Sequence, residues 1–428
     1  MTGPFSSEHR VWSMLLGKSA FVAAVLLAVP AVGAAVAVSD HMEKRAVAAI
    51  LSDKGRAISS VEELQRVLRV AQDGDVIRLA AGHYPKLILA GIRKTGTVTI
   101  TSADPANPAA IANLFIRDSA GLTLSGLELV ASPGSDAGAD GKGDEDGVAP
   151  QQGRPKPPGG SRFIFIVADS ERITLDRLNV HGPIGNLEAA SVLSPLLVRA
   201  SRQVTVSNSR FSFMRHGLEM LDLDGFKVIG NDFSDLRTDG IRGGNSSNIE
   251  IAYNVMTDFF PAAGDHPDGI QLWALPRTTT MDNISIHDNI VVRGRGASTQ
   301  GIFIRNVKNT FLFRNLNIRD NQVMGGLGNG IAVCCADGAL IEGNRVINYP
   351  DRKISWIRLD TNRGVVMRNN RAPRFMVARS EVEDKHNKVD NPGKIDEPAL
   401  VAQWLDAQPG RRRADSALQV RMTDRRGR

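Results

Sequence analysis

The feature that most constrains this chain is a short strand-like segment that recurs along its second half. Six copies start at His216, Asp239, Asp268, Gln300, Asn329 and Ser355, and all but the last have glycine as their second residue. Their starts lie 23 to 32 residues apart. Self-similarity with a period of this size is typical of solenoids, in which each repeat buries its apolar face against its neighbours. The uneven spacing indicates coils that carry loops of different lengths.

A second set of segments alternates apolar and polar residues and contains an Asn or Asp before a further apolar pair. Clear examples are QVTVSNSRFSF from Gln203 and NIEIAYNVMTD from Asn248. Alternation over so few residues is typical of short β-strands. We expect the asparagines to lie at a corner of each coil, to tolerate left-handed backbone there and to bond to one another along the stack. These residues are Asn208, Asn231, Asn254, Asn289 and Asn344.

Length and composition agree with a repeat array. A chain of 428 residues would ordinarily form two or three globular domains, unless it grows along one axis. The 41 glycines and the 5% aromatic content suit many brief strands joined by tight turns. We therefore predict an all-β fold, a right-handed parallel β-helix.

The start of the predicted solenoid carries a resemblance to a known group. VEELQRVLRVA, from Val61, has the apolar spacing of one amphipathic helix and predicts a short N-terminal capping helix. It precedes DGDVIRLAAGHY and the alternating segment GTVTITSAD from Gly96. This order resembles the opening of the pectate-lyase-like superfamily, particularly its lyases of acidic polysaccharides. The resemblance implies a parallel β-helix over about residues 58–380 and an acidic polysaccharide as substrate.

The N-terminal segment indicates export. Arg10 and Lys18 precede an apolar run over 20–38, and small residues at Ala35, Ala37 and Ser39 follow the pattern of a signal-peptidase site. We predict that residues 1–39 are either a cleaved signal peptide or an uncleaved membrane anchor. Either alternative places the body of the protein in the periplasm, outside the cell or in the cell envelope, and the membrane is expected as a partner only through this segment.

Other parts of the chain lie outside the predicted coils. Residues 132–161 are so rich in Gly, Pro and charge that we expect a flexible inserted loop. For residues 381–428 we expect a C-terminal cap followed by a disordered basic tail. Cys334 and Cys335 are adjacent in sequence, so they cannot form long-range staples, and we interpret them as packing residues.

Lining up the glycine-centred strands predicts which residues face outward. Alternation sends Leu218, Ile241, Ile270, Ile302, Ile331 and Ile357 into the core and their neighbours out. The first outward column is His216, Asp239, Asp268, Gln300, Asn329 and Ser355. The second is Glu219, Arg242, Gln271, Phe303, Ala332 and Arg358, and the third is Leu221, Gly244, Trp273, Arg305, Cys334 and Asp360.

These columns predict a polysaccharide-binding groove centred on Asp239 and Asp268. Adjacent coils are ~4.8 Å apart, so the two carboxylates should be neighbours and should raise each other's pKa. The predicted substrate-binding residues offer hydrogen bonds and an indole face for sugar rings. They are His216, Glu219, Gln271, Trp273, Gln300 and Arg358.

The same groups suit three reactions. In a β-elimination, Arg242 or Arg305 neutralises a uronate carboxylate, His266 or His216 removes the C5 proton, and Asp239, Asp265 and Asp268 hold Ca²⁺ through hard oxygen ligands. In a hydrolysis, one Asp protonates the glycosidic oxygen while another activates water. A C5 epimerase shares the first step of the elimination. For Asp239 or Asp268 taken singly, turn chemistry alone explains an Asp-Gly pair equally well.

Missing motifs order these alternatives. The Asp-Asp, Gly-His-Gly and Arg-Ile-Lys set of polygalacturonase-type hydrolases is not found in the sequence, so hydrolysis ranks second. The Lys and Arg signature of chondroitinase- and alginate-type lyases is not matched beyond the opening coil either. A non-catalytic, adhesin-like envelope protein that only binds a polysaccharide remains a further alternative. We expect no organic cofactor and no nucleic-acid partner.

Overall fold

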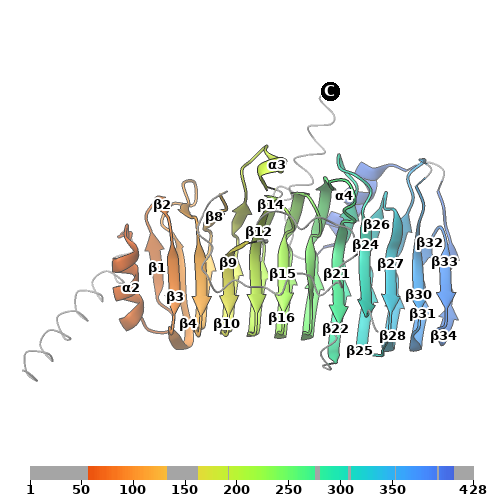
Figure 1. The fold of residues 1–428 in the computed structure, drawn as a ribbon, viewed down its shortest axis with the longest axis horizontal. Coiled ribbons are helices and arrows are strands. Elements are labelled where there is room, and N and C mark those ends of the chain that lie inside the picture. Colours follow the sequence, from red (N-terminus) through yellow and green to blue (C-terminus); the bar gives the residue numbers. More distant parts are fainter. Residues whose placement is uncertain are drawn as a thin grey trace, which may run out of the picture. The chain divides into compact units, whose positions relative to one another are not determined.

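A computed structural model describes residues 56–132, 162–190, 192–274, 280–306, 310–351, 353–392 and 395–408. In this part of the chain three parallel sheets form the sides of successive coils, and each sheet pairs strands from consecutive coils. Figure 1 shows these strands side by side from β1 to β34. The predicted right-handed parallel β-helix is confirmed.

Sheet A contains twelve strands: β1 (Val76–Leu79), β4 (Arg93–Ser102), β7 (Ala120–Ser125), β10 (Glu171–Asp176), β13 (Arg202–Ser207), β16 (Asp224–Ile229), β19 (Ser247–Ala252), β22 (Met281–His287), β25 (Phe313–Arg319), β28 (Ala336–Glu342), β31 (Arg363–Arg368) and β34 (Val382–Lys385). Sheet B contains twelve shorter ones: β2 (Gly82–Tyr84), β5 (Ala109–Ile111), β8 (Glu128–Val130), β11 (Asn179–His181), β14 (Arg210–Met214), β17 (Asp232–Leu236), β20 (Val255–Phe259), β23 (Ile290–Val292), β26 (Gln322–Met324), β29 (Arg345–Ile347), β32 (Arg371–Ala372) and β35 (Lys388–Val389).

Sheet C contains eleven strands: β3 (Leu87–Ala90), β6 (Leu114–Arg117), β9 (Arg162–Ala168), β12 (Leu193–Arg199), β15 (Leu218–Leu221), β18 (Ile241–Gly244), β21 (Asp268–Ala274), β24 (Gln300–Asn306), β27 (Gly328–Cys334), β30 (Ser355–Asp360) and β33 (Phe375–Ala378). The strands continue to Val389, beyond the predicted boundary at residue 380. The glycine-centred segments of the sequence all fall in or directly before strands of sheet C.

Three helices accompany the described coils: α2 (Val61–Val70), α3 (Leu187–Ala190) and α4 (Glu397–Ala407). Helix α2 lies beside the first coil, where the sequence predicts a helix (Figure 1). The Ser60 hydroxyl accepts the Glu63 N–H at 3.1 Å and caps this helix, because the first turn has no internal acceptor for that donor. Leu64, Val67 and Leu68 are its buried face.

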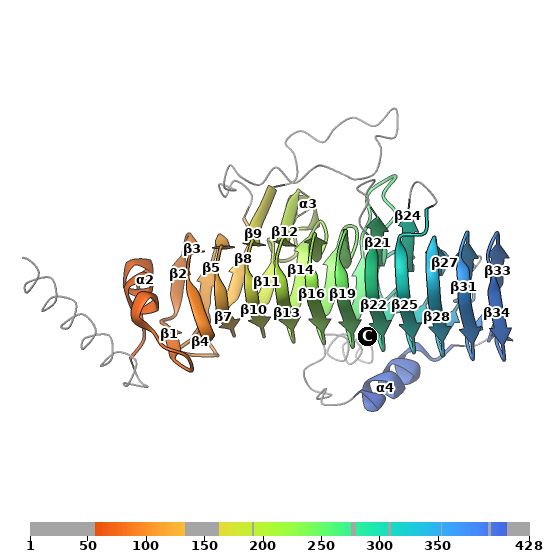
Figure 2. The same ribbon diagram turned by 90° about the horizontal axis from the view of Figure 1, so that it is seen from below.

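Helix α4 covers part of the outer face of sheet B (Figure 2). Val401, Trp404 and Leu405 pack in one cluster with outward apolar residues of sheet B such as Ile290 and Val292. The C-terminal segment therefore runs back along the side of the coils. The predicted basic tail from Arg411 onward, most of the insert 132–161 and the N-terminal segment 1–39 lie outside the described residues. Among the residues described, no helix is long and apolar enough to span a membrane.

A buried asparagine ladder joins the coils at the corner between sheets A and B. Each side-chain Nδ2 donates to the Oδ1 of the next coil at 2.8–3.1 Å, from Asn231 through Asn254, Asn289, Asn321, Asn344 and Asn370 to Asn387. Each Oδ1 also accepts a backbone N–H from the previous coil, as Asn289 does from Asn254 at 3.0 Å. The predicted amide stacking is confirmed for Asn231, Asn254, Asn289 and Asn344.

Two details of the asparagine prediction are wrong. Asn208 is not in the ladder, because Ser209 occupies that position and donates its backbone N–H to Oδ1 of Asn231 at 2.9 Å. Asn208 is exposed, and its side-chain amide donates to Asp176 at 2.8 Å. Asn208 itself has the predicted left-handed backbone (φ 50°), but in the ladder coils this conformation belongs to the residue before each asparagine, such as Tyr253 (φ 59°) and Asp288 (φ 52°). The turn therefore bends one residue earlier and leaves the asparagine free to point inward.

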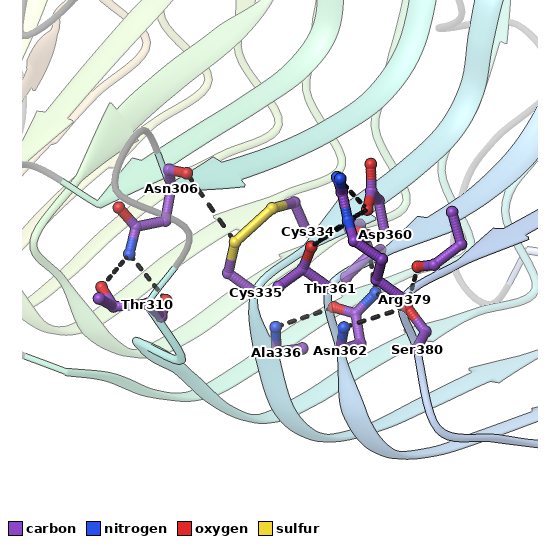
Figure 3. The surroundings of a disulfide bond; sticks show 12 residues. Asn306, Thr310, Cys334, Cys335, Ala336, Asp360, Thr361, Asn362, Arg379 and Ser380 are labelled. Carbon is purple, nitrogen blue, oxygen red and sulfur yellow. Dashed lines mark hydrogen bonds and ion pairs between the residues drawn. A yellow bond between two sulfur atoms is a disulfide. The ribbon is translucent and has the colours of Figure 1, made fainter.

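The interpretation of the two cysteines as simple packing residues is also wrong. Cys334 and Cys335 form a disulfide with each other at the corner between β27 and β28 (Figure 3). Cys335 is fully buried, whereas Cys334, the last residue of β27, faces outward and is partly exposed. Adjacent cysteines cannot form long-range cross-links, but they can bond to each other, as they do here.

We predict that the asparagine ladder contributes strongly to stability. Asn289→Ala leaves the Asn254 N–H and the Ile251 carbonyl without their buried partner, which should cost about 2–4 kcal/mol. Asn208→Gly, which keeps the left-handed backbone and removes only an exposed bond, should cost within about 1 kcal/mol. Denaturant and thermal unfolding of both variants measure the difference. Equal losses of unfolding free energy would contradict a special contribution of the ladder to stability.

Candidate functional site

The strands that carry the candidate site pair in the register that the sequence predicts. Leu218, Ile241, Ile270, Ile302, Ile331 and Ile357 are cross-strand neighbours in this order, and all are buried. The second and third columns follow this register, but the prediction that the first column faces outward is wrong. His216, Asp239, Asp268 and Ser355 are buried, because each lies two positions before an inward residue and so points to the same side of the strand. A bulge between Asn329 and Ile331 places Asn329 opposite Trp356 and Ser355 opposite Gly328, so Asn329 and Ser355 are not direct neighbours.

Asp239 and Asp268 are in contact at the centre of the predicted groove. The backbone N–H of Asp268 donates to Oδ1 of Asp239 at 3.0 Å. The Gln271 side-chain amide donates to Oδ2 of Asp268 at 2.6 Å. Asp268 is 0% exposed and Asp239 4% exposed, so both carboxyls lie beneath the surface. The predicted proximity of the two is confirmed.

The environment of this pair favours the protonated forms. Burial raises the pKa of Asp268 to about 7, and the charge of Asp239 adds to the rise against the opposing effects of His266 and Gln271. Burial also raises the pKa of Asp239, although Arg242 and the Asp268 N–H act in the other direction. At neutral pH the pair therefore shares less than two negative charges.

His266 is the exposed titratable group beside this pair. Its side chain is 63% exposed, and Nδ1 lies 3.8 Å from Oδ2 of Asp268. The Asp268 carboxyl raises the pKa of His266, against partial burial, which favours the neutral imidazole. An imidazole that faces solvent on one side and a buried carboxyl on the other suits acid–base chemistry.

Arg242 connects the carboxyl pair to two further groups. Its Nη1 lies 3.5 Å from Oδ2 of Asp239 and its Nε lies 3.4 Å from Oε2 of Glu219. Its guanidinium also lies over the indole of Trp273, 5.0 Å from the ring centroid. The guanidinium is therefore positioned by two carboxyls and stacks on the half-buried indole.

His216 and Glu219 are buried beneath Arg242 and the carboxyl pair. Nε2 of His216 is 3.2 Å from Oε2 of Glu219, and the two residues are 2% and 8% exposed. Burial lowers the pKa of His216, so the neutral imidazole is favoured. For Glu219, burial acts to raise the pKa, but Arg242 and His216 outweigh it and hold the pKa below its ordinary value.

The remaining predicted binding residues lie at increasing distance along sheet C. Gln300 pairs with Asp268 on the next strand and accepts the Asn329 amide. Arg305 is exposed and is the direct cross-strand neighbour of Trp273. Arg358 is two strands further on, where its Nη2 bonds to Asp360 at 2.8 Å. Arg358 is therefore outside the cluster around Asp268.

The predicted calcium ligands do not converge. Oδ2 of Asp265 accepts Nε of Arg237 at 2.7 Å and the Ala262 N–H at 3.0 Å. Within the described ranges, no three His, Cys, Asp or Glu side chains gather as a metal site would require. The calcium site at Asp239, Asp265 and Asp268 stays a prediction that this geometry does not support.

The alignment of the repeats predicted one aromatic residue of this face, Phe303, and missed another, Phe163. The Phe163 ring makes an edge contact with the His216 ring at 6.2 Å, and Phe303 is the outward neighbour of Gln271 on β24. Phe163 belongs to β9, whose segment RFIFIVA lacks the glycine on which the copies were aligned. The continuous apolar run from Phe163 to Ala168 is the signal that could have found it, because such a short run is consistent with a buried strand.

A protein-family model, described as the right-handed β-helix region, matches the sequence over residues 194–372. The match agrees with the three parallel sheets, and the described coils form a right-handed parallel β-helix. No curated protein matches the sequence of this β-helix.

Solved structures resemble the β-helix at low identity. The surface adhesin PfbA of Streptococcus pneumoniae has 10% identity and a TM-score of 0.44 over 78% of this chain and 100% of its own. The polygalacturonase of Erwinia carotovora ssp. carotovora has 15% identity and a TM-score of 0.42 over 79% and 94%. DFA-IIIase of Arthrobacter chlorophenolicus A6 has 11% identity and a TM-score of 0.41 over 80% and 84%. These likenesses carry no argument about activity.

The raised pKa of Asp268 predicts how stability depends on pH. The folded pKa of about 7 exceeds the ordinary value of 3.8, so the stabilising effect of the proton is complete below about pH 4 and is lost as pH rises through 7. Asp268→Asn removes this dependence. Relative to the wild type, the variant should gain about 1–4 kcal/mol between pH 4 and pH 8, as measured by denaturant unfolding. The exposed Asp118→Asn variant is the control and should show no such gain.

Proposed function

We propose that this β-helix is an exported enzyme that acts on an acidic polysaccharide bound along the outer face of sheet C. The observation that carries the proposal is the exposed His266 imidazole beside the buried Asp268 carboxyl. Trp273, held under Arg242, offers a flat face for a sugar ring, and the exposed Arg305 lies directly beside it. A base, an aromatic platform and a cation are thus combined on neighbouring strands.

The reaction that fits this arrangement best is β-elimination. Arg305 pairs with the uronate carboxylate and so acidifies the adjacent C5–H. The Nε2 of His266, opposite the nitrogen that faces Asp268, takes the C5 proton. The electron pair of that bond forms the C4=C5 double bond while the C4–O bond to the leaving sugar breaks, and the leaving oxygen takes a proton from water. Asp268 holds the imidazole and stabilises its protonated form.

The other groups of the cluster act as positioning residues in this proposal. Arg242 was predicted to neutralise substrate, but it is already engaged by Glu219, Asp239 and Trp273. His216 and Glu219 were predicted to contact substrate, yet both are buried. We therefore assign these three residues to the orientation of Trp273 and of the carboxyl pair, while Gln271 and Gln300 offer amides at the surface.

Hydrolysis is the second candidate, and one observation favours it. A carboxyl with a pKa of about 7 is partly protonated at neutral pH and can donate a proton to a glycosidic oxygen. Oδ1 of Asp268 has no hydrogen-bond partner within the described chain. The full burial of Asp268 counts against direct contact with a substrate. A C5 epimerase would use the same first proton transfer as the elimination and then return a proton to the other face.

Export is supported by two features of the chain. The N-terminal sequence has the order of a signal peptide or anchor. The Cys334–Cys335 disulfide also fits an oxidising compartment, because cytosolic thiols are kept reduced. Fractionation of a cell that expresses the full chain tests this part of the proposal.

We expect the full-length protein to release unsaturated products from a uronate polymer. Incubation with polygalacturonate or with alginate should increase absorbance near about 235 nm, which reports the new C4=C5 bond. New reducing ends without this absorbance would establish hydrolysis instead. Exchange of solvent deuterium into C5 without cleavage would indicate epimerisation. Binding of the polymer without any reaction would indicate a non-catalytic, adhesin-like protein.

Variants of His266 and Asp268 test the assignment of the base. His266→Ala should lower kcat by roughly 10²- to 10⁴-fold, whereas the exposed His83→Ala should not change it. In the wild type, activity should rise with pH as His266 loses its proton. Asp268→Asn removes the group that raises the pKa of His266, so the acid limb of its pH profile should move to lower pH. An unchanged profile would show that Asp268 does not act through His266.

A further inference from the structure

The Cys334–Cys335 disulfide lies in line with the proposed groove. Trp273 and Arg305 are cross-strand neighbours in the third outward column, and Cys334 and Asp360 are neighbours further along it. The intervening pair Ile304 and Val333 aligns β24 with β27, so Cys334 follows Arg305 on the next coil. In β27 the inward residues Ile331 and Val333 are buried, and alternation directs Cys334 outward.

The turn at this corner does not by itself require a cysteine. Cys335 has a left-handed backbone, with φ of 71°, and its N–H donates to the Thr361 carbonyl of the next coil. Corners at the same place in other coils have residues of several kinds in the left-handed region, including Ala200, Asp222, Asn245, Thr361 and Arg379. Asn and Asp are the common choices for such a backbone. A cysteine pair in their place indicates a role for the sulfur atoms themselves.

Cations lie on both sides of the disulfide. Arg305 is exposed on the preceding coil. On the following coil, Nη2 of Arg358 bonds to Asp360 at 2.8 Å, and Nη2 of Arg379, on the coil after that, bonds to the same carboxylate at 2.8 Å. Both arginine side chains are exposed. Figure 3 shows Asp360 and Arg379 on one side of the disulfide and Asn306 on the other. The surface around the sulfur atoms is therefore positive on balance, as an acidic polymer requires.

We propose that the Cys334–Cys335 disulfide is an apolar platform for one sugar ring of the acidic polymer, in a binding subsite two coils beyond Trp273. This inference rests on the proposed function and adds a subsite to it. Sulfur is polarisable and packs well on the C–H face of a ring. The bond to the buried Cys335 prevents rotation of the Cys334 side chain, whereas two separate thiols would turn independently. The coil spacing of ~4.8 Å is close to the length that one sugar unit adds to an extended chain.

Protection of the disulfide tests the proposal in the wild-type protein. The chain contains only these two cysteines, so thiol labelling after timed reduction with a phosphine reports on this bond alone. An octamer of galacturonate or of alginate, at ten times its Kd, should slow reduction by about tenfold. A dimer of the same sugar, too short to extend from Trp273 to Cys334, should give much less protection at matched saturation.

Each result of the protection experiment decides something. Binding of the octamer with an unchanged reduction rate overturns the platform and leaves the proposed function intact. Equal protection by dimer and octamer also overturns it, because the effect would then come from general stabilisation. If the wild type binds neither polymer series, the proposed function fails and the platform fails with it.

Two double variants separate the platform from the corner. Cys334→Leu with Cys335→Asn keeps an apolar outward group and gives the corner a residue that tolerates left-handed backbone. Cys334→Ser with Cys335→Asn has the same corner but a polar outward group. We expect the Ser variant to bind the octamer roughly three- to tenfold more weakly than the Leu variant. As a control that leaves both cysteines in place, the Thr361→Asn variant at the next corner should bind the octamer as the wild type does. Equal affinity of the two double variants for the octamer would overturn the platform.

Discussion

The hydrogen bonding between consecutive coils is the constraint on which the rest of this structure depends. Parallel pairing places equivalent residues of neighbouring coils side by side at ~4.8 Å, in sheets A, B and C alike. The asparagine ladder secures the same register at a buried corner, because each amide bonds to the next coil through both its side chain and the backbone. A residue in these strands is therefore adjacent to its equivalent on the next coil, except at bulges such as the one after Asn329.

Stacking of this kind forces charged groups together. Asp239 and Asp268 occupy the same position on adjacent coils, and burial leaves them little solvent to separate their charges. The structure responds in two ways: the pKa of Asp268 rises, and Arg242 lies close to Asp239 and Glu219. Removal of one partner from such a buried network leaves another charge uncompensated, which is costly. The buried contacts among Glu219, Asp239, Arg242 and Asp268 therefore hold these side chains in fixed positions.

Burial divides the face of sheet C into two layers. His216, Glu219, Asp239 and Asp268 form the lower layer, which a polymer cannot reach directly. His266, Arg305 and Cys334 belong to the upper one, with Trp273 between the two. The chemistry that we propose follows from this division, since the exposed imidazole has its protonation set by a carboxyl below it.

The sequence by itself determined the solenoid, the inward column from Leu218 to Ile357 and the contact between Asp239 and Asp268, because strand alternation and coil stacking are local, periodic rules. It did not determine where the polypeptide departs from that period. The bulge after Asn329, the corner that bends one residue before each ladder asparagine, and the ion pair between Asp265 and Arg237 depend on loops whose course no repeat specifies. Only the tertiary structure decided that Glu219 and His216 are covered and that Cys334 bonds to Cys335, since burial and side-chain direction depend on neighbouring coils in three dimensions.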